Sequence, residues 1–384
     1  MIPYGRQTIS DADVEAVVRV MRSDFLTQGP QVPAFEAAVA KHVGAQHALA
    51  VNSATSALHL ACLALDVGPG DLLWTSPNSF VASSNCALYC GADVDFVDID
   101  PRSYNMCTKA LSAKLQHAAN AGRLPKVLVP VHFAGQSCDM VTIGSLAKQY
   151  GIRVIEDASH AIGGRWLDNS VGDCSYSDIT VFSFHPVKII TTAEGGMLTT
   201  NSPSLATRAA DLRSHGITRD VARLTRQDQG AWYYEQRSLG FNYRMTELQA
   251  ALGLSQMSEL DRFVTARHSL VARYTTGLAD LPIVLPWQHP DAYSAFHLYV
   301  IQVKDEARLN RRDLFDGLRA AGIYANVHYI PIHTHPYYAG LGFKAGDFPE
   351  AEAYYDRALS LPLYADLSEQ DQNFVIETLR ELLG

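Results

Sequence analysis

Between about residues 45 and 200, short apolar runs alternate with stretches of helical spacing, and this alternation constrains the fold more than any other feature of the chain. The predicted strands cover residues 48–52, 72–75, 94–98, 127–131, 152–157 and 179–183. The predicted helices cover residues 55–65, 79–89 and 140–150. Strands that alternate with helices form a mostly parallel sheet with helices on both faces. The sequence therefore predicts an α/β fold.

The pattern changes after about residue 245. A long helical region covers residues 245–279, with a break expected near Asp261. It leads to a strand at residues 298–303 and to helices at residues 309–321, 349–359 and 368–383. A chain of 384 residues is long enough for one large and one smaller domain. We expect a large domain over residues 1–255 and a small C-terminal α/β domain over residues 256–384.

Composition narrows the class of protein. The formal net charge is -9 and basic residues form no long block, which argues against a nucleic-acid surface. The 6 cysteines include no C-x-x-C pair, so free and mostly buried thiols in a reducing compartment fit better than disulfides. No signal peptide and no membrane-spanning apolar run is recognisable. We expect a cytoplasmic protein that does not associate with membranes.

Lys188 and Asp157 suggest a specific chemistry. Lys188 is flanked by apolar residues just past a predicted strand, and Asp157 ends another strand. Taken alone, Lys188 fits a solvated lysine and Asp157 fits a helix N-cap. Together they are what a pyridoxal phosphate enzyme needs: an amine in partly apolar surroundings that forms a Schiff base with the cofactor aldehyde, and a carboxylate that keeps the pyridine nitrogen protonated.

Other polar side chains also follow strand-like runs, where ligands of α/β sheets bind. Residues 53–56 open a predicted helix whose N–H groups fit a phosphate, although a plain Ser/Thr cap is commoner. Ser183 adds a hydroxyl near Lys188. Phe80, on a loop before a helix, fits either core packing or stacking on a planar ring.

Two further groups of residues favour less specific interpretations. His328, His333 and His335 are interrupted by prolines and joined by no cysteine or carboxylate, so we expect no metal site. Four arginines of a predicted loop fit solvated side chains better than diphosphate ligands: Arg213, Arg219, Arg223 and Arg226. The chain contains no Walker loop, G-x-G-x-x-G, H-E-x-x-H or G-x-S-x-G motif.

Four ordered motifs resemble those of the nucleotide-sugar aminotransferases of the DegT/DnrJ/EryC type. The motifs are residues 52–59 (NSATSALH), 156–161 (EDASHA), 182–188 (FSFHPVK) and 240–245 (GFNYRM). The resemblance extends from residues 26–30 (LTQGP) to residues 360–363 (SLPL). It implies a fold-type I pyridoxal phosphate enzyme with the aspartate aminotransferase fold.

The resemblance also implies a role for each matching position. Lys188 would form the Schiff base, Asp157 would bind the pyridine nitrogen, His160 would lie beside the ring and Phe80 would stack on it. The phosphate would be held by Ala54, Thr55 and Ser183, and by Asn242 of a second subunit, which implies a homodimer with shared active sites. The substrate pocket would be lined by Tyr4, Leu26, Thr27, Gln28, Ser56, His328, Tyr329 and Ile330.

Within the family, the chain is most similar to the transaminases of pseudaminic acid biosynthesis. Ala54, where many members have glycine, and residues 189–192 (IITT) and 329–331 (YIP) carry this finer resemblance. It implies transfer of the amino group of L-glutamate to C4 of a UDP-linked 4-keto-6-deoxy-N-acetyl hexose, by a ping-pong mechanism. The alternatives are a perosamine-type 4- or 3-aminotransferase, a dehydratase of the same fold, which Lys188 disfavours, and a regulatory protein without catalysis.

Overall fold

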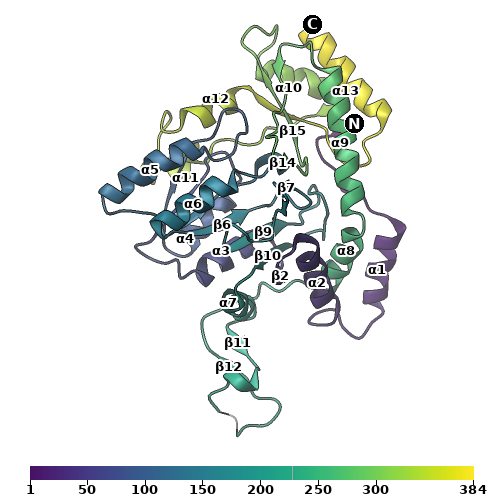
Figure 1. The fold of residues 1–384 in the computed structure, drawn as a ribbon. Helices are drawn as coiled ribbons and strands as arrows, with labels where there is room; N and C mark the ends of the chain where they lie inside the picture. The colour runs from purple at the N-terminus through teal and green to yellow at the C-terminus, as the bar shows by residue number, and fades with distance from the viewer. Residues whose placement is uncertain (227) are drawn as a thin grey trace.

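The computed structural model describes residues 1–226 and 228–384, and a seven-stranded sheet lies at its centre (Figure 1). The strands are β2 (His47–Val51), β3 (Leu72–Thr75), β4 (Asp93–Phe96), β5 (Val127–Val129), β6 (Arg153–Asp157), β9 (Ile179–Ser183) and β10 (Gly196–Thr200). They lie in the order β2-β10-β9-β6-β5-β3-β4, and only β10 runs antiparallel to its neighbours. The predicted α/β fold with a mostly parallel sheet is confirmed.

Helices cover both faces of this sheet, because successive residues of a strand point to opposite faces. In β5, Val127 and Val129 belong to an apolar cluster that includes α3 (Ala54–Ala64), α4 (Ala82–Tyr89) and α7 (Pro203–Arg213). Leu128 belongs to a second cluster with α5 (Thr108–Asn120) and α6 (Met140–Tyr150). A third cluster packs α2 (Gln31–Val43) against β9 and β10. The strands are therefore buried on both faces, as parallel sheets generally are.

The strand β10 is not predicted by the sequence pattern, and its position explains why it forms. It pairs with β2 on one side and with β9 on the other, so that Gly196 lies opposite both Val51 and Ser183. Hydrogen bonds to two neighbours make this short segment a central strand. The same pairing brings the end of β9 close to the start of α3, which follows β2 in the chain.

Several element boundaries differ by a few residues from the sequence prediction, and three places are informative. The helix predicted at residues 79–89 begins only at Ala82, because residues 79–81 form a loop. The strand predicted at residues 127–131 ends at Val129, since Pro130 has no N–H to continue the ladder. The break expected near Asp261 lies between α8 (Glu247–Met257) and α9 (Leu260–Gly277); Asp261 belongs to the first turn of α9, where a carboxylate is favourable.

The C-terminal part of the chain has an antiparallel sheet of its own. Its strands are β13 (Ile283–Val284), β15 (Tyr299–Val303) and β17 (Ala358–Leu361). This sheet packs with α9, α10 (Arg311–Ala320) and α13 (Glu369–Leu383) around a separate apolar cluster. The first strand of the chain, β1 (Ile2–Pro3), pairs with β16 (Ile323–Tyr324), so Ile2 also joins this cluster. The domain boundary at residue 255 stays a prediction.

The remaining elements surround these two sheets. They are α1 (Asp11–Met21), which packs on α8, the strands β7 (Arg165–Trp166), β8 (Asn169–Ser170) and β14 (Ala292–Tyr293), the helices α11 (Pro336–Ala339) and α12 (Pro349–Arg357), and the 3-10 turns η1 (Phe133–Gly135), η2 (Val221–Arg223) and η3 (Ile332–Thr334). A hairpin of β11 (Ile217–Thr218) and β12 (Glu235–Gln236) forms an arm that projects from the body (Figure 1). Among the described residues, none of the helices has both the length and the apolar character that a membrane span requires.

Candidate active site

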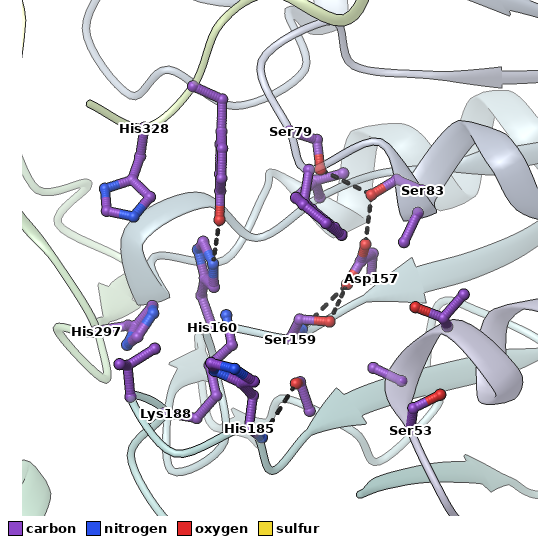
Figure 2. Close-up of a pocket in the computed structure, with 18 of the residues that line it drawn as sticks. Ser53, Ser79, Ser83, Asp157, Ser159, His160, His185, Lys188, His297 and His328 are labelled. Carbon is purple, nitrogen blue, oxygen red and sulfur yellow. Dashed lines mark hydrogen bonds between the residues drawn. The ribbon is translucent and has the colours of Figure 1, made fainter. Parts of the chain in front are cut away.

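A cavity of about 540 Å³ lies where β6 and β9 end and α3 begins (Figure 2). This is the position at which α/β sheets bind ligands. Ten of the residues predicted for the site line it: Tyr4, Ala54, Thr55, Phe80, Asp157, His160, Ser183, Lys188, His328 and Tyr329. The tertiary structure thus gathers into one cavity side chains that lie more than 300 residues apart in the sequence.

Asp157 is fixed in this cavity by three hydrogen bonds. Its Oδ1 accepts from the backbone N–H of Ser159 at 3.1 Å and from the Ser159 hydroxyl at 2.6 Å. Its Oδ2 accepts from the Ser83 hydroxyl at 2.6 Å, and that hydroxyl lies 2.7 Å from Ser79 Oγ. Asp157 is 4 % exposed and lines the cavity, and hydrogen bonds to both oxygens orient its carboxylate.

Lys188 lies in the loop between β9 and β10. Its backbone N–H donates to His185, and the loop is closed by Phe184, which bonds to Thr192 and to Gly195. Desolvation lowers the pKa of the Lys188 amine to about 8, although the charge of Asp157 acts in the opposite direction. The neutral form of the amine, which is a nucleophile and a base, is therefore more populated near physiological pH than in an ordinary lysine.

The start of α3 forms the opposite end of the cavity. Ser53 is the N-cap, and its hydroxyl accepts from the Ser56 N–H at 3.1 Å. The N–H groups of Ala54 and Thr55, at the first helical positions, have no intrahelical acceptor, as at every helix start. A Cβ on Gly196 would lie 2.5 Å from the Ala54 nitrogen, so only glycine allows β10 to approach this turn. The turn has free N–H donors, hydroxyls and a helix dipole, which together suit a phosphate.

Aromatic rings lie over the middle of the cavity. Phe80 is 58 % exposed although it lines the cavity, and its ring centroid is 6.4 Å from that of Tyr329. The Tyr329 hydroxyl is 3.0 Å from His160 Nε2. Desolvation and the charges of Lys188 and His328 hold the pKa of His160 well below its usual value, so the ring is neutral. Phe80 thus presents an apolar face to whatever planar group enters between Asp157 and Lys188.

Six of the predicted residues lie outside the cavity lining. The Ser56 hydroxyl donates to Asn52 Oδ1 at 2.7 Å and is buried beside the cavity. Four others are exposed and belong to the segment before α2 or to the loop before η3: Leu26, Thr27, Gln28 and Ile330. Asn242 is also exposed, at the base of the arm, where its backbone bridges to Ser214. Their roles in binding stay predictions.

The structure adds site residues that the sequence reasoning does not identify. Ser159 lies in the same motif as Asp157, and its spacing of two residues could have suggested it. Ser79 and Ser83 come from the loop before α4 and from α4 itself, and no local pattern connects them with Asp157. His297, Asn326 and Glu194 also line the cavity and come from three different segments.

The histidines and arginines considered above have separate surroundings. His333 is 2.8 Å from Glu352, whereas His328 lines the cavity, so these rings do not converge. Within the described parts of the chain, no group of three or more candidate ligands is arranged to hold a metal ion. Arg213 pairs with Glu36 and Arg223 with Asp211.

These features together define a pyridoxal phosphate-dependent aminotransferase, and comparisons with known proteins agree. Residues 7–380 match the model of the DegT/DnrJ/EryC1/StrS aminotransferase family. The chain belongs to this family, as the four motifs predict. A solved structure described as a putative sugar aminotransferase, Spr1654 from Streptococcus pneumoniae in its PMP form, superposes with a TM-score of 0.91 at 29 % identity, over 100 % of this chain and 99 % of that one.

Several relatives match the whole chain, among them one from Bacillus subtilis and one from Campylobacter jejuni. The spore coat polysaccharide biosynthesis protein SpsC of Bacillus subtilis is 40 % identical over 386 aligned positions, which include 100 % of this chain and 97 % of the relative. The UDP-4-amino-4,6-dideoxy-N-acetyl-beta-L-altrosamine transaminase of Campylobacter jejuni is 36 % identical over 386 positions, with 100 % and 98 % covered.

The residues present fit pyridoxal phosphate. The start of α3 and Ser183 would hold the phosphate, Asp157 would hold the pyridine nitrogen, and Lys188 would bind the aldehyde carbon. When bound, the cofactor supplies an aldehyde that reacts with amines and a ring that withdraws electrons from the reacting carbon.

Proposed function

We propose that this protein moves the amino group of L-glutamate to C4 of a UDP-linked 4-keto-6-deoxy-N-acetyl hexose, in sugar biosynthesis of the pseudaminic acid type. The observation that carries the proposal is the Lys188 amine, whose pKa is lowered, in one cavity with the fixed carboxylate of Asp157. The name of the Campylobacter jejuni relative supports the choice of sugar.

Lys188 and Asp157 would have separate tasks in this reaction. The Lys188 amine, once it is free, would take a proton from Cα of the donor and return it at C4′ of the cofactor. Asp157 would keep the opposite end of the ring charged, and Ser83 and Ser159 hold it in place for this. Phe80 would cover one face of the ring and exclude water from it.

The same site would serve a related sugar equally well. SpsC, which is more similar in sequence than the Campylobacter jejuni enzyme, is named for spore coat polysaccharide biosynthesis. A perosamine-type aminotransferase, acting at C4 or C3, is therefore the second candidate. A regulatory protein without catalysis is disfavoured, because the Lys188 amine and the Asp157 carboxylate are both present in one cavity.

We infer a homodimer in which each subunit completes the active site of the other. Asn242 is exposed and is not part of the cavity of its own chain, although the resemblance assigns it to the cofactor phosphate. The arm next to it projects from the body and exposes large apolar side chains, among them Val221 and Trp232. An exposed apolar arm of this kind is typical of a subunit contact. The cytoplasmic location stays a prediction.

The visible spectrum of the cofactor-loaded protein tests the function directly. On addition of L-glutamate without sugar, we expect the yellow band to give way to the near-ultraviolet band of pyridoxamine phosphate. Lys188→Ala should abolish this change. The UDP-linked 4-keto sugar should then restore the yellow band, with the 4-amino product identified by mass spectrometry and NMR. A yellow band that ignores glutamate would contradict the donor, and conversion of a 3-keto sugar alone would assign the alternative.

A further inference from the structure

Four histidines line the cavity with Lys188: His185, which is exposed, and three buried rings, those of His160, His297 and His328 (Figure 2). Their hydrogen bonds differ. His160 Nδ1 accepts from the backbone N–H of Ala134 at 3.3 Å, so the proton of this ring lies on Nε2, which donates to the Tyr329 hydroxyl at 3.0 Å. Both nitrogens of His160 are therefore bonded to the protein.

His328 is bonded at both nitrogens as well. Its Nδ1 is 2.8 Å from Ser360 Oγ, and its Nε2 is 3.4 Å from the Asn326 side-chain nitrogen. Since Asn326 donates its amide hydrogen to Nε2, the ring proton lies on Nδ1 and points to Ser360. Neither His160 nor His328 has a nitrogen left for a ligand without breaking a bond inside the protein.

His297 differs from both of them. Its side chain is 3 % exposed, and its Nδ1 is buried without a hydrogen-bond partner. Among residues 1–226 and 228–384, no group forms a hydrogen bond with either ring nitrogen of His297. Its ring lies 4.4 Å from the ring of His160, centroid to centroid, and lines the same cavity. A buried polar atom without a partner is unfavourable and rare in native proteins.

The backbone holds His297 in this unfavourable place. Phe296 has a φ of 47°, in the left-handed region that bulky residues seldom adopt. The buried guanidinium of Arg267 donates to the carbonyl oxygens of Phe296, His297 and Leu363, at 3.1, 3.3 and 3.0 Å. A Cβ on Gly135 would lie 2.7 Å from the Phe296 nitrogen, so this segment is also confined from the other side. Strain that several contacts maintain is concentrated at functional sites.

The protonation state of the His297 ring indicates which chemical groups it can bind. Desolvation, together with the positive charges of Lys188 and Arg267, holds the pKa of His297 well below its usual value. A neutral imidazole has one donor and one acceptor nitrogen, which match a hydroxyl or carbonyl group better than a carboxylate or phosphate. Figure 2 shows His297 beside Lys188 and Ser53 at the other end of the cavity, so the ring is remote from the phosphate position.

We propose that His297 binds the sugar ring of the substrate, through a hydroxyl or carbonyl oxygen next to the carbon that receives the amino group. This inference rests on the proposed function and adds a residue to it. The half-reaction with glutamate does not need the neutral His297 ring, because the carboxylates of glutamate need charged partners. His297 is then a specificity-determining residue for the sugar half alone.

Calorimetry on the cofactor-loaded enzyme tests the proposal, with UDP-N-acetylglucosamine and UDP as probes. His297→Leu should weaken binding of UDP-N-acetylglucosamine about tenfold, the effect of one lost hydrogen bond, and leave UDP unchanged. His297→Gln keeps a hydrogen-bond donor and an acceptor, so it should weaken the binding of UDP-N-acetylglucosamine less. In single turnovers, both variants should react with L-glutamate at the wild-type rate and slow down only with the keto sugar.

His268→Gln is the matched control. His268 bonds to the carbonyl of Ser294 in the same segment, at 2.8 Å, but does not line the cavity. It should leave both half-reactions near the wild-type rate. Equal weakening of UDP and UDP-N-acetylglucosamine, equal slowing of both half-reactions, or loss of the cofactor from His297→Gln would overturn the inference. A wild-type enzyme that fails to respond to glutamate would instead remove the proposed function and this inference with it.

Discussion

The hydroxyl of Ser83 donates to Asp157 Oδ2 at 2.6 Å, across a separation of 74 residues in the chain. Asp157 ends β6, and Ser83 lies in the first turn of α4, which follows β3. The bond joins two elements that only the sheet order brings together. It fixes the carboxylate from the side opposite to Ser159, and so it prepares the site before any ligand enters.

Ser83→Ala should therefore weaken binding of pyridoxal phosphate about tenfold, since it removes one hydrogen bond to a charged group. The measurement is a titration of the apoprotein followed by the visible band. Ser84→Ala is the control, because the Ser84 hydroxyl bonds to Tyr338 and to the carbonyl of Val81 and not to Asp157. If both variants bind the cofactor equally well, the orienting role of Ser83 is wrong.

The lowered pKa of Lys188 predicts a pH dependence of the apoprotein. Only the neutral amine attacks an aldehyde, so the rate of cofactor binding should rise with pH and level off above about 8. Stopped-flow mixing of apoprotein with pyridoxal phosphate from pH 6 to 10 measures this profile. A rate that continues to rise towards 10.5, the ordinary value for lysine, would contradict the lowered pKa.

The same shift predicts an effect on stability. The folded chain binds the Lys188 proton less tightly than the unfolded chain, so the charged amine destabilises the fold below pH 8, and this penalty disappears as the pH rises towards 10.5. Lys188→Met should raise the melting temperature of the apoprotein by a few degrees at pH 7. At pH 10 the two proteins should melt at closely similar temperatures.

A buried pair behind the site should also control stability. His132 Nε2 lies 2.7 Å from Glu156 Oε2, and both side chains are buried. Burial opposes the charged ring, and so does the backbone N–H of Cys138, which donates to His132 Nδ1 at 3.1 Å, but the side chains of Cys138 and Glu156 raise the pKa of His132 to about 10. Burial likewise opposes the charged carboxyl, but the bond to His132 lowers the pKa of Glu156. Glu156→Gln or His132→Gln alone should cost about 3–5 kcal/mol of unfolding free energy, and the double variant less than the sum.

The directions of the two pKa shifts define the pH range in which the His132–Glu156 pair stabilises the fold. The contribution of His132, whose pKa is raised, is complete below 6.5 and is lost as the pH rises towards 10. The contribution of Glu156, whose pKa is lowered, is complete above 4.5 and is lost at more acid pH. Chemical denaturation should show the largest difference between wild type and the double variant at pH 5–6, within these limits. A difference that does not change with pH would show that the pair is not ionised.

Mixing two inactive variants tests the shared active site. Lys188→Ala disables the site of its own chain, whereas Asn242→Asp places a negative charge beside the phosphate of the partner's site. In a mixed dimer, one site has both defects and the other has none. Co-expression should thus restore about a quarter of the wild-type rate, because half of the dimers are mixed and each has one intact site. No restoration, with a monomer by light scattering, would reject the shared site.

Local pattern predicts much of this fold. Residues 140–150 and 179–183 have the predicted bounds, because helical spacing and an apolar run each specify their own period. β10 is different: its five residues carry no distinct strand pattern, and pairing with both β2 and β9 makes them a strand. The break predicted near Asp261 is confirmed between α8 and α9, and Asp261 itself lies in the first turn of α9, where a carboxylate is favourable.

The sequence by itself determined the family and the cofactor and pointed to Lys188 and Asp157, because these depend on short motifs that each lie within a few residues. Tertiary structure alone decided which other groups reach them. Ser83 and His297 arrive from α4 and from the segment before β15, and no local pattern marks them. The physical reason is that a hydrogen bond or an unpaired nitrogen depends on distances between elements, which are set by sheet order and packing and not by neighbours along the chain.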